Sequence, residues 1–306
     1  MFKLLEKDFR IDQSELDEIR EVALSIHAIH NARGIPATVY HYTTCAGLMG
    51  ILDTGRLRAS HIAFMNDAKE YAYGAELLSR VITDKMQGPS HRQGIIEVIY
   101  KFIRPDSFGV AHYMPCFVFC FTSKRDDLSQ WRAYGRGEGG FAIGFDTGKL
   151  LDVFDGRLCY PSYVVYDPQQ QYDYAELLVE KTLELYNRHS NLHSGDDTYS
   201  ERWYEAWRAV AACLAPLVKY PAFVEEDEWR IVYIPSNPGE FHFHENQKSM
   251  RPFVEVDIAD RGLIKEVLVG PGPSKDLNRI ALDMLLSKKQ ISVCDIAISE
   301  IPYRVA

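Results

Sequence analysis

The chain has 306 residues, of which 46% are hydrophobic and 25% are charged, the balance of a soluble globular protein. A formal net charge of −9 disfavours a long basic groove for nucleic acid, but it leaves room for an enzyme that modifies a nucleic acid in one local pocket. The six cysteines are too sparse for a secreted disulfide scaffold. The charged N-terminal residues lack the apolar centre of a signal peptide, and the longest uncharged helical stretch, residues 209–218, is too short to span a bilayer. We therefore expect a cytoplasmic protein with no membrane partner.

Short predicted strands alternate with helices along the first half of the chain. A ragged apolar stripe through Leu16, Ile19 and Val22 predicts an N-terminal helix over residues 12–33, before the helix-breaking Gly34 and Pro36. In chain order the other expected elements are a strand at 37–44, a helix at 46–53 that ends at Gly55, a strand at 57–64, helices up to 81 and around 93–103, a strand at 116–122, a helix at 126–135 and a strand at 140–145.

A predicted helical insertion over about residues 168–220 dominates the second half. The clearest strand of the chain follows at 223–235, and three shorter strand candidates lie at 241–245, 253–258 and 264–271. Strands from distant parts of the chain thus flank the insertion, and no repeat or linker divides them. We therefore expect one α+β domain over residues 1–306.

Two motifs are more simply explained without a ligand. Residues 135–140, GRGEGG, match the pattern G-x-G-x-x-G. A predicted helix precedes them and a strand follows, which is the reverse of the dinucleotide-binding context. His242 and His244 alternate on one strand face with Glu245 nearby, but no further pair of ligands supports a metal. We therefore expect no metal site.

Polar side chains interrupt segments that should otherwise be apolar. In YHYTT, period-two alternation places His41 and Thr43 on one strand face. An imidazole and a hydroxyl there can bind a ribose diol, although a satisfied core histidine is the plainer alternative. In FVEEDEWRIVYI, alternation places Glu226, Glu228 and Arg230 on one face, which crowds two carboxylates against a guanidinium unless this is an exposed strand end.

Two aromatic residues lie between these segments. Trp131 and Tyr134, three positions apart on a predicted helix, share a face and can stack on a planar ring. Ordinary core packing uses the same spacing, so the pair is ambiguous when it is taken alone.

The order of these segments resembles a known bacterial family. In chain order the motifs are YHYT, ILDTGRL, FMNDAKE, CFTSKRDDLSQWRAYGRGEGGFAIGFD, EEDEWRIV and IKEVLVGP, which together span roughly residues 38–272. They look like the family catalogued as domain of unknown function 2971. The chain departs from it at Thr44, where serine is usual, and at Ala68, where the Asn-Asp loop usually has proline.

That family is in turn similar to the ADP-ribosyltransferase fold of DNA-modifying toxins and poly-ADP-ribose polymerases. The resemblance implies a split β-sheet core, with the N-terminal helix and the helical insertion added to it, and NAD as co-substrate. It also implies roles for individual residues of this chain. The expected NAD-binding residues are His41, Thr43, Asn66, Trp131 and Tyr134, and the expected catalytic residues are Glu228 and, at the acceptor, Glu226.

The function implied by this resemblance is NAD-dependent ADP-ribosyl transfer to an unknown macromolecular acceptor, protein or nucleic acid, in a toxin or phage-defence setting. A mono-ADP-ribosyltransferase and an NAD glycohydrolase, for which water is the acceptor, are not separated by the sequence. The alternative is a catalytically inactive nucleotide-binding, ligand-binding or protein-interaction module of the same fold. The oligomeric state is left open.

Overall fold

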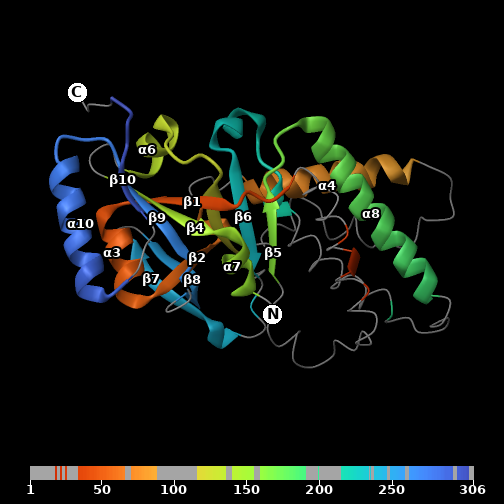
Figure 1. Ribbon diagram of the computed structural model, residues 1–306. Coiled ribbons are helices and arrows are strands. Elements are labelled where there is room, and N and C mark those ends of the chain that lie inside the picture. Colours follow the sequence, from red (N-terminus) through yellow and green to blue (C-terminus); the bar gives the residue numbers. More distant parts are fainter. Residues whose placement is uncertain are drawn as a thin grey trace.

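The computed structural model describes residues 34–65, 70–87, 116–135, 140–154, 159–190, 215–233, 238–246, 249–258, 262–291 and 295–302, together with a few single positions. Within these residues the chain forms an α+β structure around a mixed, mostly antiparallel open sheet (Figure 1). The predicted α+β class is confirmed.

The elements follow one another from β1 near the N-terminal end of the described residues to β10 near the C-terminal end. The strands are β1 (Thr38–Thr43), β2 (Arg56–His61), β3 (Phe117–Thr122), β4 (Phe141–Asp146), β5 (Cys159–Tyr163), β6 (Glu228–Tyr233), β7 (Phe241–Asn246), β8 (Ser249–Asp257), β9 (Ile264–Val269) and β10 (Asp295–Ile298). The α-helices are α3 (Cys45–Thr54), α4 (Glu70–Met86), α6 (Leu128–Tyr134), α7 (Thr147–Asp152), α8 (Pro168–Ser190) and α10 (Lys275–Lys289). Short 3₁₀ turns are η2 (Ile62–Phe64), η7 (Ala215–Leu217), η8 (Pro221–Glu226) and η9 (Pro238–Glu240).

The sheet divides at β3. Strand β6 pairs with β3 along its whole length, from Phe117 to Thr122, so the other two neighbours of β3 share its opposite edge. At that edge β2 pairs with Phe117 and Val118, whereas β1 pairs only at Thr122, opposite Tyr40. Strands β1 and β2 therefore diverge from β3 in opposite directions, and helix α3 connects them across the gap.

Beyond the division, each half of the sheet continues as a separate run of strands. From β1 the order is β1, β4, β9 and β10, and from β2 it is β2, β8 and β7; β5 lies on the outer edge of β6. The pairs are antiparallel except for β9 with β10.

Helices cover both faces of the sheet. On one face α3, α7 and α10 pack over Phe119, Phe121 and Trp229. On the other face α4 and α8 pack over Val118 and Val232. In Figure 1, α10 and α3 lie together at one end of the molecule, and α4 and α8 lie at the other. The alternation of β3 between the two cores explains why its sequence is apolar without a break.

Several predicted elements differ from the structure or fall beyond the described part. The N-terminal helix at 12–33 and the helix at 93–103 lie outside the described residues, apart from single positions, and so does most of 191–214 within the helical insertion. The described start of that insertion, α8, begins at Pro168. Helices α7 and α10 and strands β5 and β10 were not predicted from the sequence.

Candidate functional site

The segment that opens the site, YHYTTCAGLMG, changes from strand to helix at Thr44. The Thr44 side chain accepts a hydrogen bond from the Gly47 amide at 3.2 Å and so caps α3, a position where threonine is favoured. The helix ends at Gly55, whose φ of 62° is left-handed and therefore suits glycine. Helix α3 follows directly after β1. It lies beside the gap that opens between β1 and β3, because β1 pairs with β3 only at Thr122.

His41 lies at that gap. Its Nδ1 atom is 3.0 Å from the carbonyl oxygen of Cys120, in the part of β3 that β1 does not pair with. Because a carbonyl only accepts, Nδ1 donates in this contact and Nε2 is left as an acceptor when the ring is neutral. Burial lowers the pKa of His41, and the Cys120 carbonyl opposes this only in part, so the imidazole is neutral at pH 7.

A cavity of about 60 Å³ adjoins His41 and brings distant segments together. Its walls come from β1, β3, α6 and the residues around the start of β6. They are formed by Tyr40, His41, Tyr42, Cys120, Phe121, Thr122, Gln130, Tyr134, Glu226 and Glu228. Four of the residues predicted from the sequence, namely His41, Tyr134, Glu226 and Glu228, therefore line one cavity.

Glu228, the first residue of β6, presents a buried carboxylate there. Arg230 donates to both of its oxygens, from Nε at 2.8 Å and from Nη2 at 2.9 Å. Residues two apart on a strand share a face, which is why these two side chains meet. Lys219 Nζ lies 3.1 Å from Oε2 of the same carboxylate. Glu228 is thus paired with two buried cations.

This pairing sets the charge of Glu228. Burial alone would raise its pKa, but the charges of Arg230 and Lys219 outweigh burial and bring the pKa of Glu228 to about 2. The carboxylate is therefore ionised at any physiological pH. Burial, together with Glu226 and Glu228, raises the pKa of Tyr134, so its phenol stays protonated beside the acids.

Glu226 reaches the cavity from a different element. Residues 221–226 form the 3₁₀ turn η8, and Asp227 has a left-handed φ of 42°, so β6 begins only at Glu228. The prediction that Glu226 and Glu228 share one strand face is therefore wrong, because Pro221 favours the first turn of a helix and the chain kinks at Asp227. The two acids nevertheless meet through Lys219, whose Nζ is 2.5 Å from Oε2 of Glu226.

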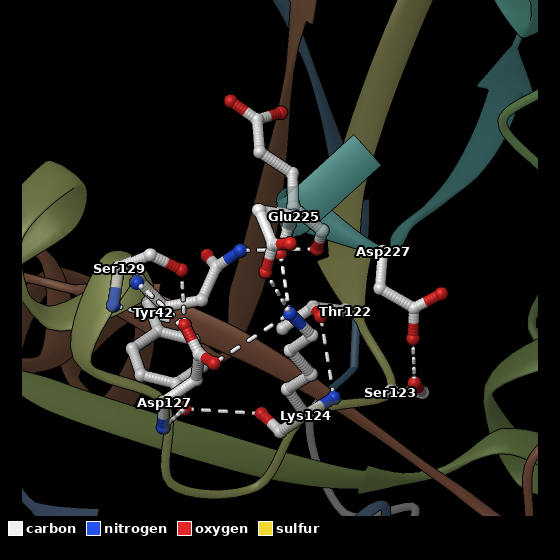
Figure 2. Close-up of polar contacts among 10 residues, drawn as sticks. Tyr42, Thr122, Ser123, Lys124, Asp127, Ser129, Glu225 and Asp227 are labelled. Carbon is white, nitrogen blue, oxygen red and sulfur yellow. Dashed lines mark hydrogen bonds and ion pairs between the residues drawn. The ribbon is translucent and has the colours of Figure 1, made fainter. Parts of the chain in front are cut away.

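The loop between β3 and α6 fixes η8 in place (Figure 2). Ser123 donates a hydrogen bond to the Asp227 carboxylate. Lys124 Nζ donates to the Glu225 carbonyl at 2.6 Å and lies 3.6 Å from Oδ2 of Asp127. Figure 2 shows Lys124 pointing between these two acidic segments. The loop is in turn tied to β1, because the hydroxyl of Tyr42 donates to the Lys124 carbonyl at 3.0 Å.

The two aromatic candidates on α6 have different surroundings. Tyr134 lines the cavity, whereas Trp131 is 2% exposed and lies outside the cavity walls. The Trp131 ring meets Tyr42 edge-on at 4.6 Å between centroids, and its Nε1 donates to Asp126 at 2.7 Å. Trp131 therefore packs in the core behind the cavity wall, against Tyr42, and does not line the cavity itself.

A second cavity, of about 210 Å³, lies on the other side of His41. It shares His41, Cys120 and Phe121 with the first cavity, so the two adjoin at the gap between β1 and β3. The remaining walls come from β1, α3 and β2, with Phe119 of β3. They are Thr43, Ala46, Gly47, Gly50, Ile51, Thr54, Arg56, Leu57, Arg58 and Phe119. Thr43 thus lies in the second cavity, next to but outside the one that holds the acids.

Residues 130–231 match the model of a family described as "Protein of unknown function (DUF2971)". The predicted resemblance to this family is confirmed over these residues. This segment includes Gln130, Tyr134, Glu226 and Glu228, which line the first cavity, whereas β1 with His41 and Thr43 precedes it. Comparisons with curated proteins and with solved structures gave no match.

Three further predictions concern Asn66, a metal site and the membrane. Asn66 lies outside the described residues. Among the residues that are described, no group of three or more histidine, cysteine or acidic side chains could hold a metal ion. In that same part of the chain, none of the helices has both the length and the apolar character needed to cross a bilayer.

The matched residues 130–231 also contribute side chains to the site that were not predicted from the sequence. Lys219 contacts both acids, and the hydroxyl of Tyr166 accepts a hydrogen bond from the Glu228 amide at 3.2 Å. Gln130 donates to the Glu226 carbonyl at 3.0 Å. Neither Lys219 nor Tyr166 belongs to the strand pattern that singled out Glu228. The only signal in the sequence for Lys219 is that a lysine precedes Glu226 and Glu228 by a few residues.

Proposed function

We propose that the two adjoining cavities bind NAD and that the protein transfers its ADP-ribose to an acceptor. The observation that carries this proposal is the meeting of His41, Tyr134 and Glu228 in one cavity, although they come from three separate segments. These are the residue types that the ADP-ribosyltransferase resemblance implies for ribose binding, nicotinamide stacking and catalysis. The divided sheet, with His41 at the division, is consistent with the split core of that fold.

The two cavities adjoin at His41, Cys120 and Phe121, so one extended ligand can contact both. Their volumes of about 60 Å³ and about 210 Å³ are small beside the roughly 300–1,000 Å³ that small-molecule pockets usually enclose, so a whole dinucleotide would fill both and extend beyond them. A dinucleotide would place its nicotinamide ribose between Tyr134 and Glu228 and extend past His41 toward Thr43 and Arg56.

The proposed reaction breaks the bond between nicotinamide and C1′ of its ribose. Nicotinamide leaves as a neutral molecule with the bonding electrons, and positive charge develops on the sugar. Glu228 is ionised, buried and held by Arg230, so it can stabilise that charge through the ribose 2′-hydroxyl. The acceptor then bonds to C1′, and Glu226 takes up the proton that the acceptor loses.

The neutral state of His41 fits its proposed role. Nδ1 donates to the Cys120 carbonyl, which leaves Nε2 to accept a hydrogen bond from a ribose hydroxyl. A charged imidazole would offer only donors. Because the fixed contact is made to a backbone atom of β3, it also holds the ring in one orientation at the gap.

Release of nicotinamide from NAD tests this proposal. The wild-type protein should release it, and Glu228→Gln, which keeps the size of the side chain but removes the charge, should lower kcat by about 10²–10³-fold. Thermal unfolding of the same variant reports whether it is folded. If the folded variant releases nicotinamide as fast as the wild type, or if the wild type releases none, ADP-ribosyl transfer by this site is wrong.

One observation favours a second candidate, a nucleotide-binding module without turnover. A carboxylate offers about four acceptor positions. Arg230 fills one on each oxygen of Glu228, Lys219 fills another, and the Cys120 thiol also donates to this carboxylate. A ribose hydroxyl would have to displace the thiol, which is a weak donor. If it does not, NAD should raise the melting temperature of the wild type while no nicotinamide is released.

A further inference from the structure

Lys219 has a backbone position that is fixed from two sides. Its amide donates to the Val165 carbonyl at 3.1 Å, and its own carbonyl accepts from Nε2 of Gln171 at 2.7 Å. The preceding residue, Val218, forms a parallel bridge with Val165. The start of the helical insertion, where α8 begins, thereby determines where the Lys219 side chain emerges.

The side chain of Lys219 is directed at the acid pair. It is 7% exposed, and its Nζ lies 2.5 Å from Oε2 of Glu226 and 3.1 Å from Oε2 of Glu228. The ammonium also lies 5.0 Å from the centre of the Phe223 ring, within the range of a cation–π contact. One buried ammonium therefore bridges η8 and β6 across the kink at Asp227.

Lys219 does more than neutralise one acid. Arg230 pairs with both oxygens of Glu228, so Lys219 supplies a counter-charge for Glu226. It also contacts Glu228, which gives the two acids a common partner although they belong to different elements. Since Asp227 between them is in the left-handed region, their relative position is not set by regular strand geometry.

We propose that Lys219 is a positioning residue that makes Glu226 and Glu228 act as one unit. This inference rests on the proposed function, because it assigns Lys219 to the alignment of the acceptor-side acid with the acid that stabilises the sugar. Lys219 itself does not touch the reacting atoms. Its role is to keep the two carboxylates at a fixed separation, and a misplacement of about 1 Å in such a pair can cost about 100-fold in rate.

The test compares Lys219→Met with a matched variant, Lys85→Met. Lys85 also bridges two glutamates, Glu176 at 3.0 Å and Glu180 at 2.7 Å, but it does so between α4 and α8, away from both cavities. Nicotinamide release from NAD is measured between pH 5 and pH 8 for both variants, for Lys219→Arg and for the wild type. Circular dichroism reports folding, and Lys219→Gln replaces the Met variant if that variant is unfolded.

Lys219→Met should lower kcat by about 100-fold with little change in KM, and Lys85→Met should leave both unchanged. The pH profile gives a second readout. Removal of Lys219 takes away one of the two cations that lower the pKa of Glu228, so this pKa should rise. The activity of the Met variant should therefore fall toward pH 5, where that of the wild type is constant. The charged and titratable groups that face Glu228 are Arg230, Lys219, Glu226, Tyr134, Tyr166 and Cys120. Lys219→Arg should restore the flat profile and part of kcat.

The outcomes separate the two proposals. A wild type that releases no nicotinamide contradicts the proposed function and this inference with it. An active wild type with Lys219→Met indistinguishable from Lys85→Met in kcat and in pH profile overturns the positioning role alone. A large loss that is confined to KM, with no change in the pH profile, also overturns it, because that pattern marks uniform binding and leaves no role in aligning the acids.

Discussion

Arg230 holds Glu228 with two hydrogen bonds, at 2.8 and 2.9 Å, from a position two residues along the same strand. Both side chains are buried, and the Arg230 guanidinium also donates to the Pro216 carbonyl at 2.5 Å. The acid therefore cannot change its orientation without breaking a charged network. This relationship leads to predictions about stability as well as about activity.

Arg230→Met should destabilise the fold strongly, because it leaves the buried Glu228 carboxylate with one cation fewer. The loss of one partner of a buried ion pair costs about 3–5 kcal/mol in the free energy of unfolding. Urea denaturation at pH 7 measures this free energy. Arg56→Met, which removes an exposed partner of Glu255, is the control and should cost far less. Equal decreases in the free energy of unfolding for the two variants would show that the buried ion pair contributes no more to stability than the exposed one.

The low pKa of Glu228 predicts how stability depends on pH. A carboxyl group whose pKa is about 2 in the folded chain, against an ordinary value of 4.5, binds protons more weakly when folded. It therefore contributes stability above about pH 4.5 that is lost as the pH falls toward 2, at most about 3 kcal/mol. The difference in free energy of unfolding between the wild type and Glu228→Gln should shrink over this window. A difference that stays constant from pH 7 to pH 3 would contradict the assigned pKa.

Two glycines on α3 give a paired test of the second cavity. A Cβ atom at Gly47 would lie 2.0 Å from the Thr43 hydroxyl oxygen, whereas a Cβ at Gly50 would meet no atom within 4 Å. Gly47→Ala should therefore displace the Thr43 hydroxyl and weaken NAD binding, measured by calorimetry. Gly50→Ala, which does not touch Thr43, should keep the Thr43 hydroxyl in place and gain about 0.5–1 kcal/mol of stability from helix propensity. Unchanged binding by Gly47→Ala would remove Thr43 from the site.

His41→Ala should weaken NAD binding without unfolding the protein. The variant removes the acceptor Nε2 and the ring that lies between the two cavities. The loss of one hydrogen bond to a ligand corresponds to about tenfold in Kd. His242→Ala, on the exposed part of β7, serves as the control. If both variants bind NAD equally well, His41 is only a core histidine that the Cys120 carbonyl satisfies.

The sequence pointed to four residues that line one cavity, but it mispredicted part of the backbone that carries them. His41 and Glu228 were found because polar residues inside apolar strands require a reason, and that reason does not depend on knowing the strand order. The kink at Asp227 was missed because alternation in FVEEDEWRIVYI favours one continuous strand. The local signals for a turn, Pro221 and an aspartate that tolerates a positive φ, are weaker than that pattern. Trp131 was ambiguous for a similar reason, since its helical spacing serves core packing as well as a pocket.

The contact of Lys219 with both acids could not be predicted from a sequence pattern. Its side chain meets Glu226 and Glu228 because Val165, just before the helical insertion, and Gln171, in its first helix, hold the Lys219 backbone. Such a contact depends on the tertiary arrangement of η8, β6 and α8, and no periodicity in the sequence encodes it. The division of the sheet at β3 is likewise a tertiary feature, because β1 and β2 compete for one edge of the same strand.

The central claim is that NAD spans both cavities with its nicotinamide ribose at Glu228. A crystal structure of the wild-type protein with an NAD analogue whose nicotinamide–ribose bond cannot be cleaved tests it most directly. The ribose 2′-hydroxyl should lie within hydrogen-bonding distance, about 2.5–3.0 Å, of the Glu228 carboxylate, with the nicotinamide ring against Tyr134. An analogue bound elsewhere on the protein, or one whose ribose stays away from Glu228, would contradict the account.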